Sequence, residues 1–214
     1  MRIEQPEGTR GSLKWIQRAV QEHPQLLQPS AVSPIRWLSP LREDGFAEYR
    51  DGAFLDLIGQ GHLQAELRDF WPQRGPQWDG LGETSEGPIL VEAKAHIKEF
   101  YSPPSQAKGA SAEKIARAFA RVGDDLGVAV HHRWQELYYQ YANRIAFLWW
   151  LRSHGVAARL IFVSFLNDTE MAGPDRAEIW ETSFAAANYA LGLKERHRLS
   201  GFIHHVYPDV KRLS

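Results

Sequence analysis

The sequence predicts an α/β fold in which a mixed central sheet is flanked by helices. Short apolar runs of strand length alternate with longer segments in which apolar residues recur at helical spacing. Hydrophobic residues make up 43% of the 214 residues, which is enough for a complete core. We therefore expect one domain over residues 1–214, with an N-terminal helical extension (1–43) and an α/β core (44–214).

The first half of the chain is expected to form two helices and then three strands. Two segments place apolar residues three and four positions apart, which is typical of amphipathic helices. A third segment alternates apolar and polar residues, as a half-exposed strand does. A short run, a Gly-rich turn and a longer apolar run then predict two more strands. The expected bounds are 12–27 and 44–58 for the helices, and 62–71, 77–83 and 88–96 for the strands.

The second half is expected to alternate helices and strands. A loop rich in Pro and Ser (101–110) precedes the first helix, and Gly155 ends the second at the usual C-terminal position of glycine. Asp175 and Glu178 form a capping-box pattern that predicts the start of a third helix. The other expected bounds are 111–126 and 132–154 for helices, and 158–166 and 201–207 for strands.

Composition excludes several classes of protein. The chain has no cysteine, which rules out disulfides, thiolate metal sites and cysteine nucleophiles. The apolar run 146–151 is bracketed by Arg144 and Arg152, so it is too short to span a membrane. A net charge of −1 neither requires nor excludes a nucleic-acid partner. We expect a cytoplasmic protein without a membrane partner; the sequence leaves the oligomeric state open, with a homodimer as one option.

The strand at 88–96 carries an unusual set of polar residues. Successive side chains on a strand point to opposite faces, so Glu92, Lys94 and His96 share one face while Ala93 lies on the other. If residues 77–83 pair with this strand as a hairpin, Asp79 comes to lie beside Glu92. The sequence therefore predicts two carboxylates and an ammonium at one position on the sheet.

Such a group of side chains has a recognisable chemistry. Two adjacent carboxylates repel each other unless a cation lies between them, so Asp79 and Glu92 suit a divalent ion such as Mg²⁺. The carbonyl of Ala93 supplies a third oxygen. A bound ion activates a coordinated water and neutralises charge on a phosphate, and Lys94 can orient that water or stabilise negative charge. These are the components needed to hydrolyse a phosphodiester bond.

Asp79, followed thirteen residues later by Glu92-Ala-Lys94 on a strand, resembles the PD-(D/E)xK nuclease superfamily, which has a restriction-endonuclease-like fold. Residues 138–168 also resemble a little-characterised bacterial branch of that superfamily. The resemblance covers roughly residues 44–166 and implies a core ordered helix, three antiparallel strands, helix, strand. One departure is that Trp78, not Pro, precedes Asp79, although Pro has no chemical role there.

The resemblance implies both a function and site residues. By position, Asp79 and Glu92 would hold the metal and act with Lys94 as the catalytic lysine. Some branches add a glutamate from the first core helix, for which Glu48 is the candidate, and others a glutamine from the later helix, for which Gln140 is the candidate. The implied activity is hydrolysis of nucleic acid, DNA in the first instance, with Mg²⁺ or Mn²⁺ as the cofactor.

Plainer interpretations exist for each feature. An E-x-K or D-x-K match arises by chance about once in a chain of this composition, and Asp209-Val-Lys211 is a second match that we interpret as coincidental. A solvated sheet face explains Glu92 and Lys94 as an ion pair. An exposed helix face explains the polar stripe that includes Gln140 and Arg144. His96 is interpreted as a polar residue at a strand end.

Three hypotheses follow. The chain is a Mg²⁺-dependent nuclease, or a catalytically inactive nucleic-acid-binding or structural protein of the same fold, or a different protein in which E-x-K is coincidental. The two adjacent histidine pairs do not favour zinc, because neighbouring residues on a strand face opposite ways and no H-E-x-x-H or cysteine partner is present.

Overall fold

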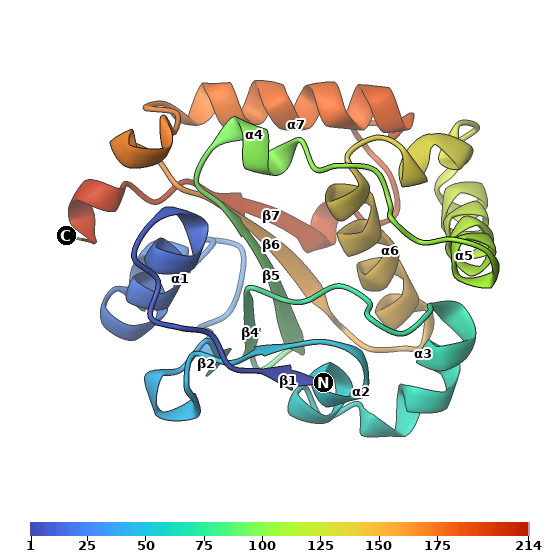
Figure 1. The fold of residues 1–214 in the computed structure, drawn as a ribbon, viewed down its shortest axis with the longest axis horizontal. Coiled ribbons are helices and arrows are strands. Elements are labelled where there is room, and N and C mark those ends of the chain that lie inside the picture. Colours follow the sequence, from blue (N-terminus) through green and yellow to red (C-terminus); the bar gives the residue numbers. More distant parts are fainter. Residues whose placement is uncertain (214) are drawn as a thin grey trace.

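A five-stranded mixed sheet forms the centre of the computed structural model, which describes residues 1–213. The strands lie in the order β2, β4, β5, β6, β7 (Figure 1). β2 is antiparallel to β4 and β4 to β5, whereas β5, β6 and β7 run parallel. The predicted α/β class with a mixed sheet is confirmed. The bounds are Arg36–Ser39 (β2), Gly80–Glu83 (β4), Pro88–Lys94 (β5), Arg159–Ser164 (β6) and Ile203–Val206 (β7).

Helices cover both faces of this sheet (Figure 1). α1 packs on one face together with the C-terminal segment, and the other helices contribute to a larger core on the opposite face. Within residues 1–213 the helices are Gly11–Glu22 (α1), Asp51–Leu57 (α2), Gln64–Phe70 (α3), Ile97–Phe100 (α4), Ala110–Leu126 (α5), Tyr139–Ser153 (α6) and Ala177–Leu191 (α7). The site described below lies on the face that carries α6.

The alternation of side chains along β5 decides which residues reach which core. Ile89, Val91 and Ala93 belong to the core under α1, whereas Leu90 belongs to the larger core on the α6 side. Because Glu92 has the same parity as Leu90, its side chain also points to the α6 side. The period of two read from the sequence is therefore confirmed.

The strand predicted at 62–71 is wrong. This segment forms a 3₁₀ turn, Gly61–Leu63, followed by α3. Leu63, Leu67 and Phe70 are buried, and their spacing of four and three residues matches one helix face. The third antiparallel strand is instead β2, which the sequence analysis missed. Because β2 lies within residues 1–43, this extension is not only helical and contributes an edge strand to the sheet.

Two predicted helices are interrupted. The segment 44–58 begins with a short strand, Glu48–Tyr49 (β3), which pairs with Arg2–Ile3 (β1), and only its second part is helical, as α2. The segment 132–154 contains a 3₁₀ turn, His131–Gln135, and α6, which are separated at Tyr138 by a left-handed backbone (φ 46°). A non-glycine residue with positive φ does not continue an α-helix, so each helix is shorter than predicted.

The remaining predicted elements are confirmed within a few residues. α1 ends at Glu22 and a 3₁₀ turn continues to Leu27, while α5, β4, β5, β6, α7 and β7 occupy the expected segments. The capping box at the start of α7 is not formed, because Arg176 occupies the N-cap position without a side-chain cap. The sheet has three antiparallel strands beside a parallel one, as the expected core does. The order along the chain differs, because β2 precedes α2 and α3 instead of following the first core helix.

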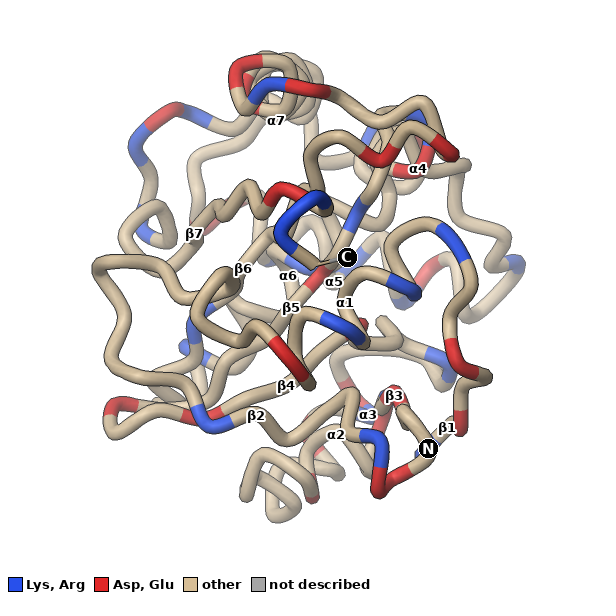
Figure 2. The backbone as a smooth tube through the Cα atoms, turned by 90° about the vertical axis from the view of Figure 1, so that its left-hand side faces the viewer, with Lys and Arg blue, Asp and Glu red and all other residues tan. Residues whose placement is uncertain are grey.

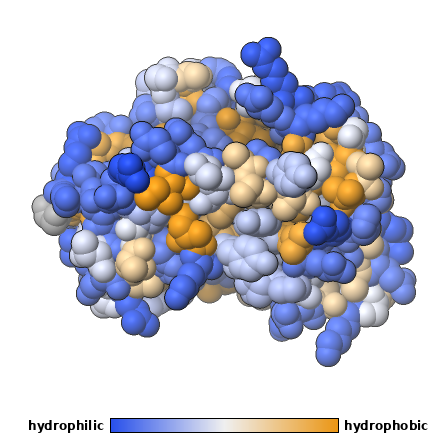
Figure 3. Space-filling view, turned by 90° about the horizontal axis from the view of Figure 1, so that it is seen from above, coloured by the Kyte–Doolittle hydropathy of each residue, from blue (hydrophilic) through white to orange (hydrophobic). Residues whose placement is uncertain are grey.

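No helix among residues 1–213 is both long and apolar enough to cross a membrane. Acidic and basic residues are interspersed along the chain in the side view, without a face of one sign (Figure 2). Seen from above, hydrophobic residues lie in small patches separated by hydrophilic ones (Figure 3).

Candidate active site

The β4–β5 hairpin brings Asp79 to Glu92. Gly80, the first residue of β4, pairs with Val91 of the antiparallel β5. Asp79, the residue just before β4, therefore lies at the level of Glu92. The backbone N–H of Ala93 donates a hydrogen bond to Asp79 Oδ2 at 2.7 Å. Since the N–H and C=O of one strand residue point to the same side, the carbonyl of Ala93 also faces Asp79. The structure thus contains the juxtaposition expected from the hairpin.

Glu92 and Lys94 form an ion pair on the α6 side of β5. Lys94 Nζ lies 2.6 Å from Glu92 Oε1. Both residues are almost fully buried, with 3% of Glu92 and 8% of Lys94 exposed. The alternative of a solvated sheet face is therefore wrong, because a sheet face open to water would leave both charges hydrated.

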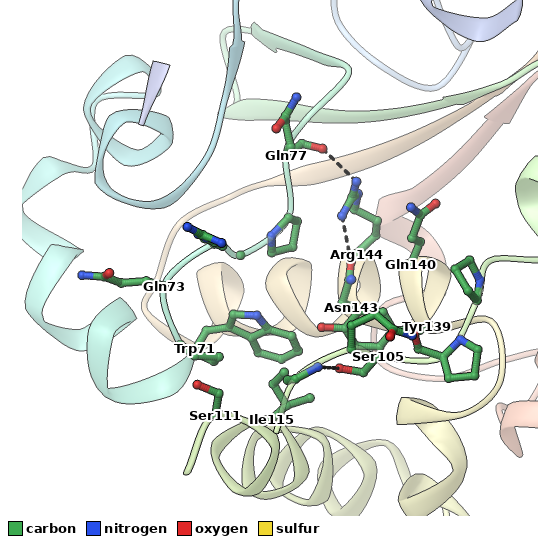
Figure 4. A pocket seen from close by; sticks show the side chains of 18 of the residues that line it. Trp71, Gln73, Gln77, Ser105, Ser111, Ile115, Tyr139, Gln140, Asn143 and Arg144 are labelled. Carbon is green, nitrogen blue, oxygen red and sulfur yellow. Dashed lines mark hydrogen bonds between the residues drawn. The ribbon is translucent and has the colours of Figure 1, made fainter. Parts of the chain in front are cut away.

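Arg144 on α6 is a site residue that the sequence analysis did not select. Its Nε donates to Glu92 Oε2 at 2.5 Å, its Nη2 to the carbonyl of Gln77 at 2.8 Å, and its Nη1 to Asn143 Oδ1 at 2.8 Å. The guanidinium also lies 4.9 Å from the ring centroid of Trp78. Figure 4 shows Arg144 between Gln77 and Asn143. Asn143 and Arg144 are buried, so the exposed-face interpretation is wrong for both residues.

Glu48 reaches the site from a different element than expected. It lies on β3 rather than on the first core helix, and it is 6% exposed. Its Oε2 accepts hydrogen bonds from the side-chain amides of Gln77 and Gln5. Because Gln77 also accepts from Arg144 through its carbonyl, this one residue connects Glu48 to the Glu92 ion pair.

The predicted site residues line one cavity with a volume of about 680 Å³. Asp79, Glu92 and Lys94 come from the hairpin, Glu48 from β3 and Gln140 from α6. Gln140 lies one helical turn before Arg144, and both side chains appear on the same side of α6 in Figure 4. Gln140 is half-buried and lines the cavity, as expected, and its chemical role stays a prediction.

Comparisons of the chain with protein-family models, with curated proteins and with solved structures found no match. The likeness to PD-(D/E)xK nucleases therefore depends on the residues and their geometry alone.

The charges of the cavity influence one another strongly. Burial raises the pKa of Asp79 well above its usual range, and the carboxylates of Glu92 and Glu48 raise it further. Burial also raises the pKa of Glu48. Burial alone would raise the pKa of Glu92, but Arg144 and Lys94 outweigh it and lower that pKa. Glu92 is thus held ionised, while Asp79 and Glu48 lack full compensation.

Lys94 is held in its charged form. Burial alone lowers the pKa of this ammonium, but the nearby carboxylates, above all Glu92 and then Asp79, more than offset the effect and raise it. A raised pKa keeps Lys94 protonated at neutral pH, so it can donate hydrogen bonds and cannot serve as a general base in this state.

Other candidate motifs have structural roles. His96 is the N-cap of α4, where its Nδ1 accepts from the backbone N–H of Glu99 at 3.3 Å. Asp209 caps the final 3₁₀ turn, where it accepts from the backbone N–H of Lys211 at 2.9 Å. Neither His96 nor the Asp209-Val-Lys211 match lines the cavity, which separates the second D-x-K from the first.

The donor atoms at the cavity suit a hard cation. Asp79, Glu92 and the Ala93 carbonyl are oxygen donors of the kind that Mg²⁺ prefers, and a bound cation would favour the ionised form of Asp79, whose pKa is raised by burial. Among residues 1–213, however, no three His, Asp or Glu side chains are already arranged around one point as a metal centre. Each oxygen of Glu92 already has one contact, with Lys94 or with Arg144, so a metal ion would have to share these oxygens with the two cations.

Proposed function

We propose that this protein is a metal-dependent nuclease of the PD-(D/E)xK type, which hydrolyses phosphodiester bonds in nucleic acid and most readily in DNA. The observation that carries the proposal is the meeting of Asp79, Glu92 and Lys94 on adjacent antiparallel strands at the wall of one cavity. A DNA substrate is consistent with a cytoplasmic location, which is part of the proposal.

The topology of the sheet supports the same proposal. β2, β4 and β5 are the three antiparallel strands, and β6 follows beside β5 in parallel after a helical crossover that contains α5 and α6. The restriction-endonuclease-like fold implies such a sheet, although here α2 and α3 separate β2 from β4 in the chain and more than one helix precedes β6. The site lies where β4 and β5 adjoin α6, so elements far apart in the sequence supply its residues.

The hairpin residues would hold the ion and Lys94 would act on the phosphate. Asp79 and Glu92 would be the metal ligands, with the Ala93 carbonyl as a third oxygen and Glu48, which lines the same cavity, as a further candidate ligand. A bound Mg²⁺ supplies acidification of a coordinated water and neutralisation of phosphate charge. Lys94, protonated by its surroundings, would donate to a phosphate oxygen as negative charge develops there.

Residues on α6 would complete the site. Arg144 holds Glu92 in place and connects it to Gln77 and Asn143. Gln140, one turn earlier and without a hydrogen bond from its side chain among residues 1–213, is free to donate to a phosphate or to the attacking water. Its backbone N–H donates to Ser102 Oγ at 2.9 Å, which fixes the start of α6 beside the cavity that Gln140 lines.

The proposal is tested by separating metal binding from chemistry. Asp79→Asn removes a negative ligand, so it should weaken Mg²⁺ binding and cleavage together. Lys94→Ala removes a positive charge beside the ion, so Mg²⁺ binding should persist or tighten while cleavage is lost. Lys211→Ala, in the second D-x-K match, is the matched control and should cleave like the wild type.

Calorimetric titration of Mg²⁺ and cleavage of plasmid and single-stranded DNA are the measurements. Mn²⁺ should replace Mg²⁺, whereas Ca²⁺ should bind but support little reaction. Wild-type protein that binds no divalent ion at millimolar concentration in the presence of DNA would refute the mechanism. An active Lys94→Ala variant would leave the metal site and remove the lysine from the chemistry.

One observation favours an alternative, a protein of the same fold that binds nucleic acid without cutting it. Both oxygens of Glu92 are paired with cations, Lys94 and Arg144, which is a stable arrangement without any ion. The same assays distinguish the two functions, because a non-catalytic protein would bind DNA and leave it intact in both Mg²⁺ and Mn²⁺.

A further inference from the structure

The cavity is bounded by walls that restrict what can reach the carboxylates. One wall is formed by residues 71–77 before β4, and the opposite wall by residues 103–108 before α5, with α6 between them. Figure 4 shows Gln73 and Trp71 on one side and Ser105 on the other. Because Glu92 and Lys94 are buried, they can contact only a group that enters between these walls.

The wall before α5 is attached to the body of the protein. The backbone N–H of Ser105 donates to the carbonyl of Gln135 at 2.7 Å, and Ser102 Oγ accepts from the backbone N–H of Gln140 at 2.9 Å. These hydrogen bonds fix the segment against the 3₁₀ turn and α6 at two points. Because this wall is held in place by the fold, the width of the cavity is fixed as well.

The size of the cavity excludes a double helix. The cavity has a volume of about 680 Å³, which is too small to take in a double helix whose major groove alone is ~12 Å wide and ~8.5 Å deep. A duplex would therefore contact the rim, leaving its phosphates outside the walls. A single strand with unpaired bases is thin enough to enter.

The rim carries cations suited to a phosphate backbone. Arg74 and Lys108 line the cavity from opposite walls, and both are exposed. Neither side chain has an ion pair or hydrogen bond within residues 1–213; the backbone N–H of Arg74 donates to Asp51 and leaves the guanidinium available. Two cations without partners on either side of an acidic floor can hold the phosphates that flank the one at the floor.

An exposed tyrosine, Tyr101, lies next to the same rim and packs on the half-buried Tyr138. Tyr101 is 57% exposed, and its ring lies edge to face with Tyr138 at 5.1 Å between centroids. Tyr101 precedes Pro103 by two residues and Tyr138 adjoins Tyr139, and both Pro103 and Tyr139 line the cavity. An aromatic ring beside a basic groove provides a surface on which an unpaired base can stack.

We infer that the substrate of this site is single-stranded nucleic acid, held by Arg74 and Lys108 at its phosphates and by Tyr101 at a base. The inference rests on the proposed nuclease function, because it names the substrate of that site. It also predicts binding that is independent of the metal, since none of these three residues is a candidate metal ligand.

The test is fluorescence anisotropy in EDTA with a labelled single strand of about 20 nucleotides, a length sufficient for such grooves, and with the same sequence as a blunt duplex. The single strand should bind at least tenfold more tightly than the duplex. Parallel DNA and RNA strands show which backbone is preferred. Cleavage with Mg²⁺ is measured separately, so its absence contradicts the proposed function while the strand preference is judged by binding alone.

Substitutions at the rim test whether its residues hold the single strand. Tyr101→Ala should weaken single-strand binding roughly tenfold, as the loss of one stacked base does, whereas Tyr189→Ala, an exposed tyrosine on α7 outside the cavity, should have no effect. Arg74→Ala and Lys108→Ala should each lower the salt slope of log K by about 0.7, in contrast to Arg10→Ala outside the cavity.

Two results would overturn the inference. One is a duplex that binds as tightly as the single strand. The other is a Tyr101→Ala variant that binds like Tyr189→Ala. All of these positions are exposed, so thermal unfolding should show unchanged stability, and a variant with a lowered Tm would be replaced by Tyr101→Leu at the same position.

Discussion

Replacement of Arg144 by Met tests the electrostatic centre of the site. Arg144 and Glu92 are 5% and 3% exposed, and their ion pair measures 2.5 Å from Nε to Oε2. Charge centres about 4 Å apart interact by about 4 kcal/mol at an effective dielectric constant of about 20. The substitution also removes the hydrogen bonds to Gln77 and Asn143.

We expect Arg144→Met to lower the free energy of unfolding by about 3 to 5 kcal/mol, the range for removing one partner of a buried ion pair. Lys94 remains beside Glu92 and partly compensates its charge, which places the value near the lower end. For a chain of this length, a loss of about 3 kcal/mol lowers the Tm by roughly 10 °C. Thermal unfolding followed by circular dichroism, with urea unfolding at fixed temperature, measures both quantities.

Two control variants show whether the loss of stability in Arg144→Met comes from the buried ion pair. Arg121→Met removes an exposed helical arginine on α5 that lies over Trp149, and it should change stability by less than about 0.5 kcal/mol. Glu92→Gln combined with Arg144→Met removes both charges, so the double variant should lose less than the sum of the single variants. Additive losses, or an Arg144→Met variant as stable as the Arg121→Met control, would refute the buried ion pair.

Two further predictions concern the sheet. Burial lowers the pKa of His205 on β7 from 6.5 to about 4. The neutral imidazole therefore contributes its full stability above pH 6.5, and up to about 3 kcal/mol of the free energy of unfolding is lost as the pH falls towards 4. His205→Phe should remove this part of the acid dependence of Tm, and an unchanged profile of Tm against pH would contradict the prediction. Gly82→Ala on β4 places a Cβ 2.6 Å from Ile35 Cγ2, so it should destabilise by about 1 to 3 kcal/mol, whereas Gly201→Ala, with no atom within 4 Å, should be nearly neutral in the same urea titration.

The central part of the site was predictable because it depends on local rules. The parity of Glu92 and Lys94 follows from the period of two along one strand, and the position of Asp79 follows from a tight hairpin with a short turn. Each relation lies within one strand or one hairpin, so neither depends on how distant elements pack. The hairpin and its polar face were accordingly read from the sequence alone.

The parts that depend on packing were not predictable in the same way. Residues 62–71 fit a period of two through Leu63 and Leu67, yet they also fit a helical face through Phe70, and only burial against the larger core selects the helix. The position of Glu48 was also assigned to the wrong element, because Phe46 and Asp51 adopt a positive φ that the sequence pattern does not reveal. Both errors concern which tertiary contact a segment makes.

The burial of Arg144 was predictable from its neighbours in the sequence. It stands alone within an otherwise apolar run from Ala142 to Leu148, apart from Asn143, and the interpretation as an exposed stripe ignored its apolar neighbours. A lone charge among residues that must be buried requires a buried partner of opposite sign. The nearest candidates in an α/β fold are acids on the adjoining strand, which points to Glu92.

The charges at the cavity decide what the site can bind. In their charged forms, the carboxylates of Glu48, Asp79 and Glu92 outnumber the cations Lys94 and Arg144 by one. A phosphodiester brought to this floor adds another negative charge, so the floor alone repels its proposed substrate at close range. A divalent cation removes that repulsion, which explains why binding at the rim and cleavage at the floor should differ in their need for metal. Metal-free protein should therefore hold a single strand at the rim and leave it uncut, and cleavage should begin only when a divalent ion compensates the carboxylates.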